Sequence, residues 1–198
     1  MVGHAGDVFD QVCTPKRGID RQTLEAVLTL AVEIAREGRE GRKIGTLFVV
    51  GDTAAVLKRS RNLILDPLQG HSDAVKRITS HDMRETIKEL AQLDGAFVVS
   101  NEDGVVISAC RYIDAPAEGL NLPLGLGSRH WAAASITRHT DAVAVVVSES
   151  SIVRVFDNGE LISEIVPELW LLRRYSLHVP GPHLEKSDRE ITVVSKPE

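Results

Sequence analysis

The sequence predicts an α/β fold: a single domain with a central mixed β-sheet flanked by helices. Segments with helical periodicity alternate with short apolar runs rich in β-branched residues, and two pairs of these runs enclose turn sequences. The chain has 198 residues, of which 43% are hydrophobic, which suits one domain with one core. We expect this domain at 21–175, after a flexible N-terminal arm at 1–20 and before a peripheral C-terminal tail at 176–198.

The helices are predicted from apolar residues at helical spacing. The segment 19–36 has a wide apolar face, and two glycines follow it. Three further helices are expected at 83–92, 129–138 and 167–174. Asp82 and Glu85 have the spacing of a capping box, and Ser128 is a suitable N-cap for the helix that follows it.

The strands are predicted from apolar runs bounded by turn residues. The runs 44–50 and 142–148 are almost continuously apolar, which is typical of strands buried on both faces. The other expected strands lie at 62–65, 96–100, 105–109, 152–156 and 161–166, with a late strand at 191–194. Turn sequences at 101–104 and 157–159 predict two hairpins.

Composition excludes several classes of protein. No run of eighteen apolar residues occurs, and the N-terminus lacks the pattern of a signal peptide, so we expect no membrane partner. The net charge of −5 makes a nucleic-acid partner a poor fit. The two cysteines are far apart and form no CxxC motif, which fits a cytoplasmic protein.

The most informative stretch is a glycine-bearing loop that enters a helix at 124–134. Gly125 and Gly127 let the backbone approach an anion closely, and the first turn of the helix offers free N–H groups. Ser128, Arg129 and His130 add side-chain donors. The stretch matches neither a Walker loop nor the Rossmann fingerprint. A capped helix with two surface polar residues is the alternative interpretation, and the residues alone leave both open.

Two acidic positions stand at predicted strand ends. Asp94 and Gly95 precede the strand that starts at Ala96, where a carboxylate could hold Mg²⁺ or Mn²⁺ near a phosphate. Ser148 and Glu149 end a buried strand, which is where ligands gather in open α/β sheets. Taken alone, a plain turn at the first pair and a polar strand end at the second are the more common interpretations.

Together these motifs resemble the diadenylate cyclase family, known as DAC or DisA_N, in its soluble archaeal-type form. The family's DGA motif is present as Asp94-Gly95-Ala96, and its RHR motif, G-[TS]-R-H-R-A-A, is present at 127–133. The segments 45–52 and 141–149 also resemble the family, and the similarity covers roughly 24–172. One position departs: Trp131 stands in place of the last arginine of RHR, which removes a possible phosphate donor.

The resemblance implies an enzyme, a metal-dependent nucleotidyltransferase that condenses two ATP molecules into cyclic di-AMP and two pyrophosphates. The ribose 3′-OH of one ATP would attack the α-phosphate of the other. Asp94, Arg129 and His130 would be catalytic. Asp94 and Glu149 would be the metal ligands for Mg²⁺ or Mn²⁺. The residues implied to bind ATP are Gly95, Ala96, Tyr112, Ile113, Gly127, Ser128, Arg129, His130 and Ser148.

The resemblance also implies a homo-oligomer in which two protomers bring their active sites face to face, because one protomer offers one ATP site. Two alternatives remain at this stage. The chain could be a regulatory module that binds ATP or cyclic di-AMP with little catalysis, which the replacement at Trp131 favours. It could also be an interaction domain whose loop at 125–130 only caps a helix, which the presence of both motifs disfavours.

Overall fold

The structure, a computed structural model, describes residues 9–114, 116, 118–167, 184–188 and 191–196. Within these ranges it confirms a single α/β domain built on one mixed sheet of nine strands, in the order β2-β4-β3-β1-β5-β6-β7-β9-β8. The helices are α1 (Arg21–Glu37), α2 (Thr53–Lys58), α3 (His81–Leu90) and α4 (Ser128–His139). The strands are β1 (Thr46–Val50), β2 (Ser60–Asn62), β3 (Ala96–Val99), β4 (Val106–Ile113), β5 (Val143–Val147), β6 (Val153–Asp157), β7 (Glu160–Val166), β8 (Leu184–Asp188) and β9 (Ile191–Ser195).

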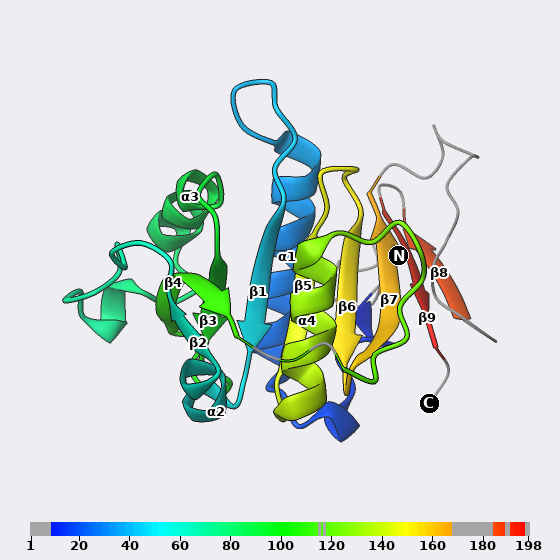
Figure 1. The fold of residues 1–198 in the computed structure, drawn as a ribbon. Helices are drawn as coiled ribbons and strands as arrows, with labels where there is room; N and C mark the ends of the chain where they lie inside the picture. The colour runs from blue at the N-terminus through cyan, green and yellow to red at the C-terminus, as the bar shows by residue number, and fades with distance from the viewer. Residues whose placement is uncertain (1–8, 115, 117, 168–183, 189–190, 197–198) are drawn as a thin grey trace.

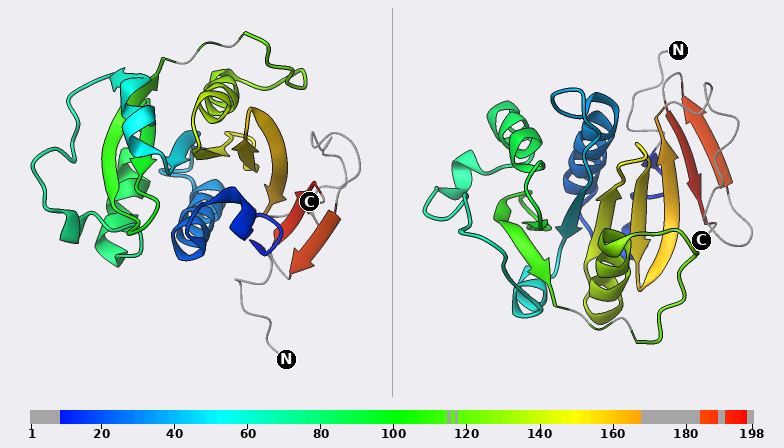
Figure 2. Two further views of the ribbon diagram at one scale, coloured as in Figure 1. Left: turned by 90° about the horizontal axis from the view of Figure 1, so that it is seen from below. Right: turned by 45° about the horizontal axis from the view of Figure 1, so that its top comes forward.

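Helices cover both faces of the sheet. In Figure 1, α1 lies behind the central strands and α4 lies in front of them, and Figure 2 shows the two helices on opposite sides of the sheet. One apolar cluster joins the sheet to α1 and α3, and a second joins it to α4. Among the described residues, no helix combines the length and the apolar character needed to cross a membrane.

The central strand β1 shows why the sequence needs a continuous apolar run there. All five of its residues are buried, and successive side chains point to opposite faces. Phe48 therefore packs in the cluster with α1, whereas Leu47 and Val49 pack in the cluster with α4. Phe48 stacks on Phe97 of the parallel strand β3 at a centroid distance of 5.2 Å. Truncating either ring to alanine is expected to cost about 3–5 kcal/mol of stability.

Two expected helix caps are wrong. The N-cap of α4 is Gly127, and Ser128 is the first helical residue. The N-cap of α3 is Ser80, so Asp82 falls inside the first turn and Glu85 is too far along for a capping box. Both predictions failed because several polar residues stand together near each helix start, and spacing alone does not select one.

The strand expected at 62–65 is also wrong in its position. The pairing with β4 runs through Ser60–Asn62, and Leu63, Ile64 and Leu65 follow it as exposed residues. The apolar triplet predicts a short strand, yet the sheet ends here and neither apolar cluster reaches these residues.

The two ends of the described chain are more integrated than expected. Instead of a loose arm, the described part before α1 contributes Phe9, Val12 and Cys13 to the core. Instead of a peripheral tail, β8 and β9 extend the sheet beyond β7, and β9 confirms the late strand predicted at 191–194. The helix expected at 167–174 lies outside the described residues, apart from its first position.

Candidate active site

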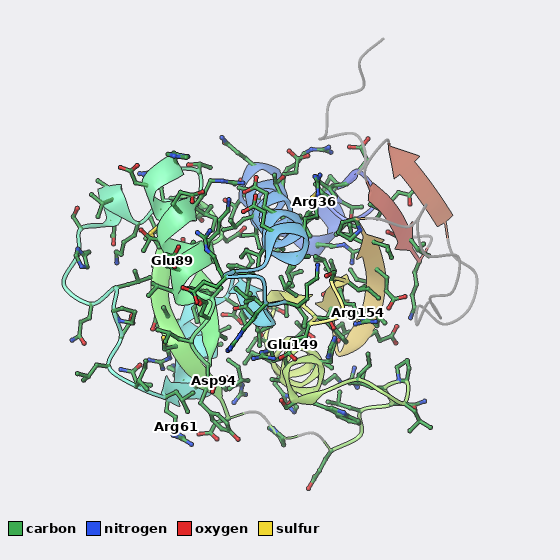
Figure 3. The ribbon with its side chains drawn as sticks, turned by 90° about the horizontal axis from the view of Figure 1, so that it is seen from above. Arg36, Arg61, Glu89, Asp94, Glu149 and Arg154 are labelled. Atoms are coloured by element: carbon green, nitrogen blue, oxygen red, sulfur yellow. The ribbon has the colours of Figure 1, made fainter. Side chains whose placement is uncertain are left out.

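Three neighbouring strands bring the predicted motifs to one edge of the sheet. β1 is parallel to β3 and antiparallel to β5, so the starts of β1 and β3 lie beside the end of β5. The flanking residues Gly45, Asp94 and Glu149 therefore share this edge. Figure 3 looks onto it and shows Asp94 and Glu149 near the start of α4. Sheet topology thus joins motifs that lie far apart in the sequence.

Asp94 lies in the turn between α3 and β3, and its side chain is 84% exposed. The next residue, Gly95, has φ +108°, and a Cβ there would lie 2.5 Å from the carbonyl carbon of Cys110. Only glycine fits, because β4 passes directly beside this turn. Cys110 itself has φ +54° at a bulge in the β3–β4 pairing. Burial raises the pKa of the Cys110 thiol, so it stays protonated and packs as an apolar group.

α4 begins where the sequence predicts an anion site. Gly127 caps the helix with extended backbone, and Gly125 before it has φ +89°. The first turn carries backbone N–H groups and the positive end of the helix dipole. Ser128 is exposed and Arg129 is partly buried. The loop and the helix start therefore have the features of an anion-binding terminus, as the sequence predicts.

Arg129 stands between the two carboxylates. Its Nη2 lies 3.6 Å from Asp94 Oδ1, and its Nη1 lies 3.3 Å from Glu149 Oε1. Both carboxylates remain largely exposed, at 84% and 69%, against 34% for the arginine side chain. Such open pairs contribute little to stability. The arrangement leaves carboxylate oxygens available to other partners.

Gly45 sets the space available to this arginine. A Cβ at Gly45 would lie 2.6 Å from Nη1 of Arg129 and 3.3 Å from Cγ of Glu149. The φ of Gly45 is not in the left-handed region, so the backbone itself would accept another residue. The absence of a side chain at Gly45 therefore leaves the space in which Arg129 and Glu149 form their pair.

A first cavity of about 680 Å³ opens beside Asp94. Tyr112 and Ile113 of β4 lie in its wall, together with Gly95 and Ala96. Trp131 lies in the wall as well. Its indole stands where the family motif has arginine, so this cavity gains an aromatic surface in place of a guanidinium. Arg111 completes the wall and donates to the carbonyl oxygens of Leu57 and Ser60.

A second cavity of about 510 Å³ lies on the other side of the helix start. Its wall combines the glycine loop, the start of α4 and the end of β5, including Ser148 and Glu149. The hydroxyls of Ser148 and Ser150 are 2.8 Å apart. Ser128 and Arg129 belong to the walls of both cavities, which therefore meet at the first turn of α4.

His130 takes a different position from its neighbour Arg129. Its side chain is 6% exposed and turns toward β6, where its Nε2 lies 3.1 Å from Nη1 of Arg154. The ring also meets Phe156 edge-on at a centroid distance of 6.2 Å. His130 reaches the second cavity from this buried position rather than as a surface group.

The two carboxylates fit a divalent cation that also binds a substrate. Mg²⁺ is commonly held by one or two carboxylates together with phosphate oxygens and water. Asp94 and Glu149 offer that donor set on either side of Arg129. Among the described residues, no cluster of three or more His, Cys, Asp or Glu side chains forms a metal site made by protein ligands alone.

Four residues at the site were not identified from the sequence: Gly45, Arg111, Arg154 and Glu164. For Arg154 and Glu164 a signal existed, because each is a charged residue inside an apolar strand. Charged residues are almost never fully buried unless they are paired. The pair could therefore have been suspected, although its link to His130 could not.

Comparison with known proteins agrees with this architecture. Residues 33–161 match the DAC family, described as "DisA bacterial checkpoint controller nucleotide-binding". A solved structure described as a hypothetical membrane spanning protein from Bacillus cereus has a similar fold, with a TM-score of 0.52 and 20% identity over 71% of this chain and 62% of that one. The fold and the family match define a nucleotide-binding α/β domain.

Two archaeal relatives are more similar in sequence. A diadenylate cyclase of Methanocaldococcus jannaschii is 46% identical over 153 residues, which are 77% of this chain and 48% of the relative. A diadenylate cyclase of Haloferax volcanii is 41% identical over 152 residues, which are 76% of this chain and 55% of the relative. This chain belongs to the DAC family of diadenylate cyclases. It spans about half the length of these two relatives.

Proposed function

We propose that this chain is a diadenylate cyclase that condenses two ATP molecules into cyclic di-AMP and two pyrophosphates. The observation that carries the proposal is the position of Arg129, between Asp94 and Glu149 and in the walls of both cavities. One ATP would place its nucleoside in the first cavity, against Tyr112 and Ile113, and its triphosphate in the second. The names of the two archaeal relatives support this substrate and product.

The chemistry follows from the groups at the junction of the cavities. The 3′-OH of one ATP attacks the α-phosphorus of the other, and the P–O bond to pyrophosphate breaks. Asp94 orients the hydroxyl and accepts its proton. Arg129, Ser128 and Ser148 donate to phosphate oxygens, and the first turn of α4 stabilises the negative charge that develops there. Gly95 and Ala96 leave room for the ribose.

A divalent cation, Mg²⁺ or Mn²⁺, would be held by Asp94 and Glu149 together with the phosphates. When bound, it neutralises phosphate charge and polarises the phosphoryl oxygens. Arg129 now occupies the space between these two carboxylates. We propose that Arg129 turns its guanidinium toward the phosphates when nucleotide and cation enter, since the same fork binds either kind of oxyanion.

Two protomers are needed for the complete reaction, because each ATP must supply a hydroxyl to the other's phosphate. We propose a homo-oligomer with face-to-face active sites, related by a twofold axis. The catalytic domain is assigned to 21–175, and residues 9–20 with β8 and β9 pack onto it. A cytoplasmic location fits the two free, buried cysteines.

The direct test is to incubate the full chain with ATP and either Mn²⁺ or Mg²⁺ and to identify the products by mass spectrometry. We expect cyclic di-AMP and pyrophosphate, with a rate per protomer that rises with protein concentration. Chelation of the metal should stop the reaction. ATP binding without any cyclic product, at every metal and protein concentration tested, would refute the cyclase proposal.

That negative result would favour the second candidate, a regulatory module that binds ATP or cyclic di-AMP. Trp131 is the observation in its favour, because the motif loses a cation at this position. Calorimetric titration with ATP and with cyclic di-AMP distinguishes the two roles. A regulatory module should bind the cyclic dinucleotide more tightly than ATP, whereas an enzyme should release it.

A further inference from the structure

A buried polar triad of His130, Arg154 and Glu164 lies at the start of α4. Arg154 on β6 stands opposite Glu164 on β7, and its Nε donates to Glu164 Oε1 at 2.6 Å. The Arg154 side chain is 5% exposed and that of Glu164 is 0% exposed. Nη1 of Arg154 meets Nε2 of His130 at 3.1 Å. Figure 3 shows Arg154 on the far side of Glu149 from Asp94.

The stability of the fold does not explain this pair. Burying an arginine and a carboxylate carries a large desolvation cost, and well-packed apolar residues at such positions are often as stable or more stable. The surroundings are apolar, since Phe156 and Val146 lie on the same side of the sheet. A third polar group, His130, is attached to the pair and also lines the second cavity. This attachment indicates a role for the pair at the site.

The contact determines where His130 carries its proton. A guanidinium has donors and no acceptor, and it keeps its charge in proteins. The short contact to Nε2 therefore requires the lone pair of that nitrogen. A neutral imidazole then has its proton on Nδ1, and an imidazolium would set an N–H against the arginine donors.

We propose that Arg154, oriented by Glu164, is a positioning residue that fixes His130 as the neutral Nδ1–H tautomer. Nδ1 is buried in the free protein, so the start of α4 must shift when nucleotide enters for this N–H to donate to a phosphate oxygen in the second cavity. This assignment rests on the proposed function for the identity of the ligand. It makes His130 a directional donor rather than a cation or a general base. Arg129, one residue earlier, supplies the mobile positive charge.

The tautomer is measured without any substrate. Long-range ¹H–¹⁵N NMR on the full chain with ¹⁵N-labelled histidine distinguishes the two neutral forms, and His130→Asn identifies the signals of His130 by their loss. We expect the Nδ1–H form in the wild type. The Nε2–H form or an imidazolium would overturn the proposal, whether or not the chain makes cyclic di-AMP.

A double variant separates positioning from stability. Arg154→Met combined with Glu164→Leu replaces the ion pair by apolar residues of similar size, so the melting temperature should stay equal or rise. We expect kcat to fall about 10-fold to 100-fold, as for the loss of a hydrogen bond to a charged group. The KM for ATP should change less. Full activity in this folded double variant would contradict the proposal.

Two variants of His130 test the direction of the donor. The amide nitrogen of asparagine occupies nearly the place of Nδ1, and that of glutamine nearly the place of Nε2. His130→Asn should therefore keep about 10-fold more activity than His130→Gln. Adding His130→Gln to the double variant should lower kcat no further, because Arg154 acts through His130. A further loss as large as that in the wild-type background would show that Arg154 does not act through His130. If the wild type makes no product, the same comparisons are made on ATP affinity.

Discussion

Lys88 and Arg129 each contact more than one carboxylate, and the two cations differ in their access to water. Lys88 on α3 lies 3.2 Å from Glu33, 3.2 Å from Glu37 and 3.0 Å from Glu85, and its side chain is 10% exposed. Arg129 meets two carboxylates at longer distances, and both are far more exposed than it is. In the Lys88 cluster three glutamates surround the ammonium group, so this cluster is closed to other partners. The Arg129 cluster can exchange its partners for a ligand.

The difference between Lys88 and Arg129 distinguishes a structural ion cluster from one that can bind a ligand. Lys88 joins α3 to α1, since Glu33 and Glu37 lie on α1, and it lines no cavity described above. Arg129 lies at a helix start in the walls of two cavities. Substitutions in the first cluster should therefore change stability, and those in the second should change catalysis.

The largest effect is expected from Asp94→Asn. The change keeps the size of the side chain and removes the group that accepts the 3′-OH proton and helps to hold the cation. Product formation should fall about 10³-fold or more, the contribution typical of a general base. ATP binding should be largely kept, and the melting temperature should not change, because Asp94 is exposed.

Glu37→Gln in the Lys88 cluster is the matched control for Asp94→Asn. It also neutralises an exposed carboxylate beside a cation, and it should leave the rate of cyclic di-AMP formation unchanged. Equal activity of Asp94→Asn and the wild type would remove Asp94 from the mechanism.

Arg129→Lys comes next in size. Lysine keeps the charge but loses the fork that meets two carboxylates or a phosphate with parallel bonds. We expect kcat/KM to fall about 10²-fold, the effect of losing one preorganised donor to a developing charge. Stability should be unchanged, because the pairs that Arg129 makes are open to water.

Lys88→Met should lower stability and leave activity unchanged. It leaves three carboxylates without their shared cation, so urea unfolding should show a loss of about 1 kcal/mol. Activity per folded molecule should be that of the wild type. A lower kcat for Lys88→Met would contradict the distinction between the closed Lys88 cluster and the Arg129 cluster, which can exchange its partners.

The elements of the site could be predicted from the sequence where the backbone alone determines them. The glycine loop before α4 and the turn at Asp94 can both be identified from their residue types, because helix termini and tight turns need particular residues. Their convergence also follows from the fold, since β1, β3 and β5 are neighbours. The continuous apolar runs that make these strands central are visible in the sequence too.

The charges of Arg154 and Glu164 suggest a pair, but neither its register, which a bulge sets, nor its link to His130 could be predicted. Regular pairing from the β6–β7 turn, with Phe156 opposite Leu161, would continue with Arg154 opposite Ser163. The register shifts between Val155 and Phe156, so Arg154 faces Glu164 instead. A one-residue shift moves a side chain to the other face of a sheet, and no residue type in this hairpin signals it.

Gly45→Ala tests the Arg129 cluster with a smaller expected effect. The new Cβ would stand 2.6 Å from Arg129 Nη1, so the guanidinium must shift away from Glu149. A displaced catalytic group loses rate steeply with distance, and we expect kcat to fall about 10-fold. The melting temperature should be unchanged, because the atoms in conflict are the far ends of flexible side chains. Gly45→Val should lower kcat further. Full activity in both variants would show that the position of Arg129 in the free protein is unrelated to catalysis.

The smallest effect is expected from Glu85→Gln, and it depends on pH. The hydrogen bond with Lys88 lowers the pKa of Glu85 below its ordinary value of 4.5. A lowered pKa in the folded state adds stability above that ordinary value, and this stability is lost as the pH falls through the folded value. The urea midpoint of Glu85→Gln should therefore lie slightly below that of the wild type at neutral pH, and the two should converge in acid. Glu102→Gln, at an exposed turn position, should show no such convergence. A gap between Glu85→Gln and the wild type that persists in acid would mean that Glu85 stabilises the α1–α3 contact by packing, and that its charge is not what closes the Lys88 cluster.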